Sequence, residues 1–270
     1  MKRLIITAIL CGMLGSVYAQ QDKPDTIKMK YDTVIIKHRA KKTSNVHVDF
    51  NGKEKAEKKE AKPGFSIGLT VFSDFYLGFA TMLDNGSFTL SSKNDFLNYN
   101  QAKTSNVGFN FFKFGYRFND NFKVTLNAGF DWTLIRLHQN IDIVPDAPTL
   151  QYVVDNNNHY SKNRFSSNYL LLPLSFAFRT SPAHGKRFSF IVGPEAGFLI
   201  DGMQKQISPE HGKTKNFNDF HFTRFEYGGF TRIGYGNLGI YAKYFFNDMF
   251  ENSPNQQGLK SFSFGITTSF

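Results

Sequence analysis

The feature of this sequence that most constrains its fold is a hydrophobic pattern with a period of two, which recurs from residue 65 to the C-terminus. From Phe122 to Thr133, for example, apolar side chains alternate with polar or small ones without interruption. This period places successive side chains on opposite faces of a β-strand. The same pattern predicts seven further strands, over residues 65–71, 107–118, 169–179, 188–198, 224–235, 238–246 and 261–270.

Local departures from the alternation predict irregular points in these strands. The pattern changes phase near Phe111, so we expect a β-bulge there. Pro173 and Pro194 lie inside alternating segments, although proline cannot donate a backbone hydrogen bond to a ladder. We therefore expect each proline to lie at a bulge or a local bend.

The composition indicates that the strands cross a membrane. Aromatic residues reach 16%, with 31 Phe and 12 Tyr, yet the mean hydropathy is −0.35. A transmembrane barrel resolves this contradiction, because each strand shows one face to lipid and the other to a polar lumen. After the first twenty residues, no stretch reaches the roughly 18 apolar residues of a membrane helix. The sequence therefore predicts an all-β fold, an eight-stranded antiparallel up-and-down transmembrane β-barrel.

The connections between the strands also follow the pattern of outer-membrane barrels, in which short periplasmic turns alternate with long external loops. Short connections are expected at residues 119–121, 181–186 and 236–237. Long polar connections are expected at residues 74–103, 138–163, 201–219 and 247–258. Because the number of strands is even, both ends of the barrel are expected on the periplasmic side.

Two segments precede the barrel domain, which is predicted over residues 64–270. Residues 1–19 have a basic start, an apolar stretch and small residues up to Ala19, so they are expected to be a cleaved signal peptide. Residues 20–63 carry 12 Lys and Arg against 7 Asp and Glu and lack a sustained apolar period, which predicts a flexible, basic periplasmic tail. Within this tail, residues 31–37 are a candidate for one short strand.

Charge and cysteine usage narrow the possible partners. The formal charge of +10 would suit a nucleic-acid ligand, but residues 64–270 hold 18 Lys and Arg against 15 Asp and Glu. The barrel is therefore nearly neutral, and no nucleic-acid partner is expected. The one cysteine, Cys11, lies in the predicted signal peptide, so the mature chain has no thiol for a disulfide or a metal site.

The end of the chain resembles the C-terminal signal by which barrel-assembly machinery recognises outer-membrane proteins. The residues that carry the resemblance alternate on one face of the last expected strand, and they are Phe262, Phe264, Ile266 and Phe270. Thr268 departs from the pattern, because that register more often holds a larger apolar residue. The resemblance implies that the assembly machinery is a partner during biogenesis.

Two internal segments resemble a family of Bacteroidetes-type barrels. Residues 168–174 resemble its Tyr-Leu-x-Ile-Pro-Leu segment, and residues 193–198 resemble its Gly-Pro-x-x-Gly segment. This is the PorT-like family, or outer-membrane β-barrel domain proteins. The resemblance covers roughly residues 64–270 and implies an outer-membrane location. One branch of the family serves in a protein secretion apparatus, and the resemblance supplies no catalytic residues.

The charged residues on the polar faces of the strands are the candidate functional residues. Because an eight-stranded lumen is narrow, such charges must pair with one another or stay hydrated. Pairing would fill the lumen with a salt-bridged plug, which is the favoured interpretation, and the alternative is a selective path for ions. The residues expected in this lumen charge network are Lys113, Arg117, Lys123, Asp131, Glu195, Arg224, Glu226, Arg232 and Lys243.

The histidines do not predict a metal or catalytic site. None of the seven pairs with another at the spacing of metal ligands, so no metal and no cofactor is expected. His138, His159, His211 and His221 fall in or beside the long loops. A lipid hydrolase would place Ser, His and an acid at this rim, and His221 could belong to such a site. No Gly-x-Ser-x-Gly nucleophile motif accompanies it, which favours simple loop polarity.

Three functional hypotheses follow. The leading one is a non-enzymatic outer-membrane barrel, a structural or interaction component whose partners are membrane lipid and a periplasmic or secretion-system protein. A PorT-like role in export is one version of it. The second hypothesis is a barrel enzyme that hydrolyses lipid or peptide, and the third is a small pore.

Overall fold

The structure consists of a β-barrel and a short two-stranded sheet. The described residues of this computed structural model are 26–28, 33–35, 63–180 and 186–269. No helix among them has the length and apolar character needed to cross a membrane. The predicted signal peptide lies outside these residues, as does most of the predicted basic tail, so both stay predictions.

The chain divides into two units, residues 1–59 and residues 60–270. In the first unit the described residues form a two-stranded antiparallel sheet of β1 (Thr26–Lys28) and β2 (Thr33–Ile35). The second strand lies within the candidate strand at residues 31–37.

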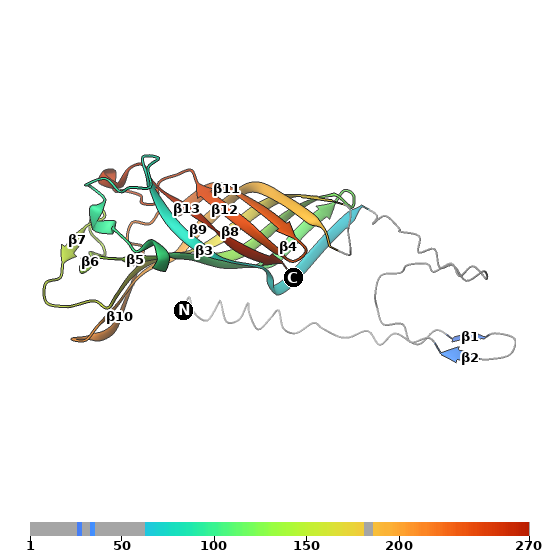
Figure 1. Cartoon of the computed structure of the whole chain (residues 1–270), viewed down its shortest axis with the longest axis horizontal. Coiled ribbons are helices and arrows are strands. Elements are labelled where there is room, and N and C mark those ends of the chain that lie inside the picture. The colour runs from blue at the N-terminus through green and yellow to red at the C-terminus, as the bar shows by residue number, and fades with distance from the viewer. Residues whose placement is uncertain (1–25, 29–32, 36–62, 181–185, 270) are drawn as a thin grey trace. The chain divides into compact units, whose positions relative to one another are not determined.

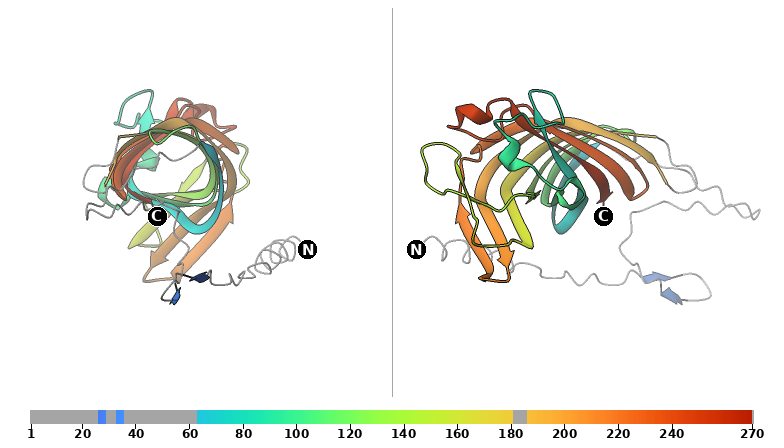
Figure 2. Two further views of the ribbon diagram at one scale, coloured as in Figure 1. Left: turned by 90° about the vertical axis from the view of Figure 1, so that its right-hand side faces the viewer. Right: turned by 60° about the vertical axis from the view of Figure 1, so that its left-hand side comes forward.

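The second unit is a closed barrel of eight strands that pair antiparallel in chain order (Figure 1). Closure comes from pairing of the last strand with the first. The predicted eight-stranded up-and-down barrel is confirmed, and its ring of strands is visible in end view (Figure 2). The barrel strands are β3 (Gly64–Asp84), β4 (Ser105–Arg117), β5 (Phe122–Leu137), β8 (Lys162–Arg179), β9 (Phe188–Ser208), β11 (Phe225–Tyr235), β12 (Leu238–Phe245) and β13 (Leu259–Ser269).

Strand β5 illustrates how the alternation builds the wall. Odd-numbered residues from Thr125 onward face the interior and are buried, whereas the outward-facing Leu126 is 43% exposed. The interior is polar in the middle of the strand, at Asp131, and apolar at its end, at Ile135 and Leu137. The same strand therefore contributes to a polar lumen and to an apolar core.

The irregular points agree only partly with the predictions. The bulge at Phe111 is confirmed, because the register of β4 on β5 shifts between Asn110 and Phe112. The register is unchanged across Pro173 and Pro194, so neither proline lies at a bulge. The ladder between β5 and β8 instead omits the pairs around Pro173 and resumes in the same register. The absence of a backbone N–H at Pro173 therefore removes hydrogen bonds only locally.

Several strands run farther than the alternation predicts, and β3 and β9 extend the most. Strand β3 continues to Asp84, through part of the long connection predicted at residues 74–103. Strand β9 continues to Ser208 and turns back as β10 (Gly212–Asn218), in place of the connection predicted at residues 201–219. The prediction for β9 is wrong because a strand beyond the membrane no longer needs an apolar outer face, so the pattern fades although pairing continues. The prediction for β3 missed an alternation that continues through Leu77 and Phe79. Figure 2 shows the β9–β10 hairpin extending beyond the barrel wall.

The short and long connections lie at opposite ends of the barrel. A tight turn at Gly236, with φ +66°, joins β11 to β12 as predicted. Gly64 pairs with Arg117 and Leu238 pairs with Thr268, so both ends of the barrel chain lie at the short-turn end. The long connections contain the short elements η1 (Asp95–Leu97), η2 (Gln101–Lys103), β6 (Ile141–Ile143), β7 (Tyr152–Val154) and η3 (Pro254–Gln256).

A hydrophobic core closes the long-loop end of the barrel. Inward-facing strand residues such as Phe165 meet loop residues such as Phe222 and Phe250, and the Phe165 and Phe222 ring centroids are 4.6 Å apart. We call this cluster the loop core, and its buried members are Met82, Phe96, Leu97, Ile135, Leu137, Ile141, Ile143, Leu150, Phe165, Phe220, Phe222, Phe250 and Leu259. Gln204 fixes β6 to it, because its side chain accepts from Ile143 N at 2.9 Å and donates to Ile141 O at 2.9 Å.

Candidate functional site

The centre of the lumen holds a hydrogen-bonded network around Asp131. The Asp131 carboxylate accepts from Lys243 Nζ at 2.8 Å, from Tyr76 Oη at 2.8 Å and from Asn106 Nδ2 at 2.9 Å. Tyr241 Oη donates to Asn106 Oδ1 at 3.0 Å. Asp131 and Lys243 are each 2% exposed, so this ion pair is shielded from bulk water. We call these five residues the Asp131 network.

A second group lies around Asp74 on β3. Lys113 Nζ lies 3.7 Å from the Asp74 carboxylate and Arg232 Nη1 lies 3.9 Å from it. Asn110 Nδ2 donates to the same carboxylate at 3.1 Å. Asp74 was missed from the sequence because its segment was assigned to a loop. The outward-facing Phe75, Leu77 and Phe79 alternate with inward-facing residues there, and that pattern could have revealed the strand.

Two further carboxylates face the lumen from neighbouring strands. Glu195 on β9 is 3% exposed and Glu226 on β11 is 8% exposed. Both carboxylate oxygens of Glu195 lack a hydrogen-bond partner among the described residues, and so does Oε1 of Glu226. These carboxylates are buried in the same lumen as the Asp131–Lys243 pair.

The remaining predicted lumen charges lie away from the middle of the barrel. Arg117 and Lys123 pair across strands at the short-turn end and are partly exposed. Arg224 does not face the lumen, so that prediction is wrong. It precedes the first residue of β11, its side chain is 74% exposed, and it pairs with Asp219 and Glu251 outside the barrel.

The Gly-Pro-x-x-Gly segment has a structural explanation in the wall. A Cβ on Gly193 would lie 1.8 Å from the backbone O of Leu174, so only glycine fits against β8. A Cβ on Gly197 would lie 2.7 Å from Glu226 Oε1, so this glycine makes room for the lumen carboxylate. Both glycines are therefore explained by close approach within the barrel.

The outer face of the barrel is apolar. Phe264 and Ile266 on β13 are 45% and 59% exposed and point away from the lumen. Phe262 shares their face, and Phe270 lies outside the described residues. An apolar outer wall around a polar, filled lumen is the arrangement of a barrel that spans a bilayer.

Residues 106–251 match the family model described as outer membrane protein beta-barrel domain. The chain belongs to this family. The match runs from β4 to the connection that follows β12, and the structure adds the first and last strands that close the barrel. Membership in the outer membrane protein beta-barrel domain family places the protein in the outer membrane. No curated protein matches the chain.

Three histidines that the structure describes, His159, His211 and His221, lie at the long-loop end of this outer-membrane barrel and contact other groups. His159 Nδ1 lies 3.1 Å from Glu210, His211 Nδ1 lies 2.6 Å from Asn158, and His221 Nε2 lies 2.6 Å from the carbonyl O of Ala147. In residues 63–180 and 186–269, no histidine ring contacts a serine hydroxyl. The described part of the chain also holds no cluster of three or more His, Cys, Asp or Glu that could bind a metal.

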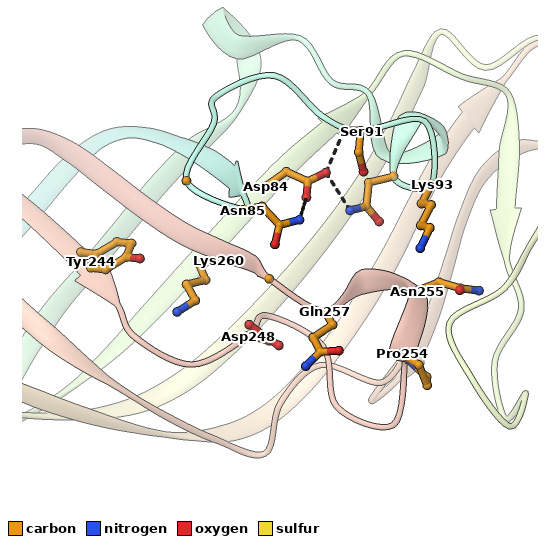
Figure 3. Close-up of a pocket in the computed structure, with 13 residues that line it drawn as sticks. Asp84, Asn85, Ser91, Lys93, Tyr244, Asp248, Pro254, Asn255, Gln257 and Lys260 are labelled. Atoms are coloured by element: carbon orange, nitrogen blue, oxygen red, sulfur yellow. Dashed lines mark hydrogen bonds between the residues drawn. The ribbon is translucent and has the colours of Figure 1, made fainter.

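A polar cleft of about 610 Å³ lies at the long-loop end, between residues 85–94 and 248–258 (Figure 3). Its Asp84 carboxylate accepts from Ser91 N at 2.7 Å, Asn94 Nδ2 at 2.9 Å and Asn85 Nδ2 at 3.0 Å. Lys260 Nζ donates to the carbonyl O of Phe246 at 2.5 Å. These contacts stabilise the two loops, so the cleft is explained by loop packing.

Proposed function

We propose that the protein is a non-enzymatic component of the outer membrane that acts through its surfaces rather than through its lumen. The observation that carries this proposal is the filled interior. The Asp131 network occupies the middle of the lumen, and the loop core covers its long-loop end. Small barrels of this kind are usually filled by side chains.

Conductance separates this proposal from a pore. The mature barrel, refolded in detergent and inserted in planar bilayers, should give no stable conductance steps, because two layers of side chains lie in series along its axis. A known porin inserted from the same detergent serves as the positive control. Reproducible unit steps from the protein would overturn the proposal in favour of an ion path.

We place the long loops at the cell surface and the two barrel ends in the periplasm, following the usual arrangement of such barrels. The periplasmic tail at residues 20–63 is then the segment that would contact a partner. A PorT-like role in protein export is the specific version of this idea, and the resemblance at residues 168–174 and 193–198 supports it.

Cross-linking in native outer membranes tests the partner. The tagged full-length protein should recover components of a secretion apparatus, and a variant that lacks residues 20–59 should lose them while remaining a folded barrel. Recovery of the barrel alone from both samples would contradict the export role. Recovery from both with equal yield would place the contact on the barrel instead of the tail.

Hydrolysis is the competing function. The positions of His159, His211 and His221 favour loop stability over catalysis, because each ring contacts an amide, a carboxylate or a carbonyl. Detergent-solubilised protein should therefore turn over neither lipid A nor peptide substrates. Turnover that is lost in His221→Ala would reverse this conclusion.

A further inference from the structure

The outer wall carries a row of cations beyond the apolar band. Four of them lie directly opposite one another across four adjacent strands, since Arg136 pairs with Arg164, Arg164 with Lys205, and Lys205 with Lys215. Lys162 and Lys213 flank this row, because both are opposite Ile207. We call these residues, Arg136, Lys162, Arg164, Lys205, Lys213 and Lys215, the basic ladder.

The basic ladder is electrostatically unfavourable by itself. Directly opposed side chains in antiparallel strands have Cβ atoms about 5 Å apart, and like charges at such positions destabilise the pair. None of the six cations forms an ion pair with an acidic residue in residues 63–180 and 186–269. Arg136 Nη2 donates to the Ser161 carbonyl O at 2.5 Å, whereas the buried Nε of Arg164 has no partner among those residues. An external anion would relieve this repulsion.

The position of the basic ladder indicates which anion it meets. Arg136 lies on the same outward face of β5 as Trp132, four residues nearer the loops. Four residues span about 13 Å of strand, which amounts to about 10 Å along the axis of a tilted barrel. On β9 the outward-facing Phe198 and Ile200 are 47% and 48% exposed, and they lie between the short-turn end and Lys205. The cations therefore begin where the lipid-facing band ends.

The hairpin strand β10 supports the same placement. Phe217 is 62% exposed and pairs with Met203. This pair lies two residues nearer the barrel than the Lys205–Lys215 pair. An exposed aromatic ring beside a row of cations suits the interface between acyl chains and headgroups. A soluble ligand would more readily reach the loop tips than this side wall.

We propose that the basic ladder binds the phosphate groups of an anionic glycolipid in the outer leaflet. Arginine presents a planar fork that matches a phosphate, and lysine adds mobile point charges, so a row of both can bind phosphates on one or two headgroups. The inference rests on the proposed orientation, in which the long loops and the hairpin face outward.

Intrinsic fluorescence provides the test, because Trp132 is the only tryptophan of the chain. The mature barrel in zwitterionic micelles is titrated with a bis-phosphorylated glycolipid, with the same glycolipid after removal of its phosphates, with inorganic phosphate, and with a DNA oligonucleotide. The phosphorylated glycolipid should give a saturable change, whereas the dephosphorylated form and inorganic phosphate should bind at least about tenfold more weakly, since each charge-assisted contact is substantial.

Two charge-matched variants identify the site. Lys205→Gln with Lys215→Gln should raise the apparent Kd for the phosphorylated glycolipid about tenfold, because two solvent-accessible charge contacts are lost. Lys93→Gln with Lys103→Gln removes the same charge from a loop at the same end and should leave Kd unchanged. Heat-dependent gel mobility verifies that both variants are folded barrels.

Three outcomes would overturn the proposal. They are equal affinity for the two glycolipid forms, equal effects of the two variants, or tighter binding of the oligonucleotide, which would indicate a soluble polyanion.

The orientation is checked by a separate experiment. Single cysteines are introduced at residue 213 and at residue 93 and tested for labelling on intact cells. Labelling failure would reject the orientation, whereas the lumen conductance result would be unaffected by any of these outcomes.

Discussion

At the scale of single residues, the lumen depends on how each charge is compensated. Lys243 and Asp131 are both buried, and the ammonium also lies 4.3 Å from the Tyr76 ring centroid. Lys113 makes a longer contact with Asp74, and its side chain is 30% exposed. Removing one partner of a buried pair leaves an unpaired charge in a low-dielectric site, whereas water can replace an exposed one.

We therefore expect Lys243→Met to destabilise the folded barrel by about 3–5 kcal/mol and Lys113→Met to cost less than about 1 kcal/mol. Urea unfolding in lipid vesicles, followed by gel mobility of the folded form, measures both. The double variant Asp131→Asn with Lys243→Met should cost less than the sum of the single changes, because neither charge is then left alone. Equal losses for Lys243→Met and Lys113→Met would contradict the role of the Asp131 network.

Glycine contacts in the wall lead to a second residue-scale prediction. A Cβ on Gly193 would meet a backbone oxygen at 1.8 Å, which cannot move without shifting β8. A Cβ on Gly229 would meet the Phe246 ring at 3.5 Å and the backbone O of Gly193 at 3.7 Å, which are ordinary van der Waals distances. Gly193→Ala should therefore destabilise the barrel by about 1–3 kcal/mol. Gly229→Ala should stay within about 0.5 kcal/mol of the wild type. The same urea titration compares them, and similar stability of the two variants would show that the wall relaxes around residue 193.

At the scale of elements, the long connection between β5 and β8 is organised by Asp155. The Tyr160 hydroxyl donates to its carboxylate at 2.5 Å and Asn158 Nδ2 donates at 2.7 Å. These bonds, with the Tyr160 bond the largest contribution, lower the pKa of Asp155 from 3.8 to about 2. The Asn157 and Asn158 backbone N–H groups also donate to this carboxylate.

The lowered pKa determines how this connection responds to acid. Because the folded-state pKa lies below the usual value, the stabilisation is fully present above about pH 4 and is lost as the pH falls toward 2. We expect the Asn157 and Asn158 amide resonances, followed by NMR in micelles, to titrate with a midpoint near pH 2.

Tyr160→Phe should move the Asp155 midpoint up toward 3.8, because the largest stabilising hydrogen bond is removed. Glu210 is the internal reference. Its pKa is also lowered to about 2, by its own backbone N–H and by His159, and should not change in this variant. A midpoint that stays near 2 in Tyr160→Phe would mean that other groups hold the carboxylate ionised.

At the scale of the whole molecule, the barrel combines three environments. An apolar band on the outside meets lipid, a polar network fills the lumen, and the loop core closes the long-loop end with buried aromatic rings. The polar network and the loop core lie in series, so loss of one leaves the other in place. Replacing residues 141–154 with a flexible linker should therefore not produce conductance by itself, whereas the same change combined with Asp131→Ala and Lys243→Ala should.

Much of this architecture follows from the sequence by itself. The period of two is a local property of a strand between lipid and a polar lumen, so it located all eight barrel strands, the faces of β5 and the turn at Gly236. The phase change near Phe111 likewise located a bulge, because an extra residue inverts the alternation. The period of two also indicated that charges such as Asp131, Glu195 and Lys243 face inward.

Tertiary structure decided the rest. The β9–β10 hairpin and the loop core lie beyond the lipid band, where both faces of a strand can be polar and the periodic signal is lost. Which charges pair was also undecided, because Asp131 and Lys243 are 112 positions apart and meet only through the closed register of the barrel. The basic ladder arises in the same way, since its cations come from four strands and are aligned only by cross-strand pairing.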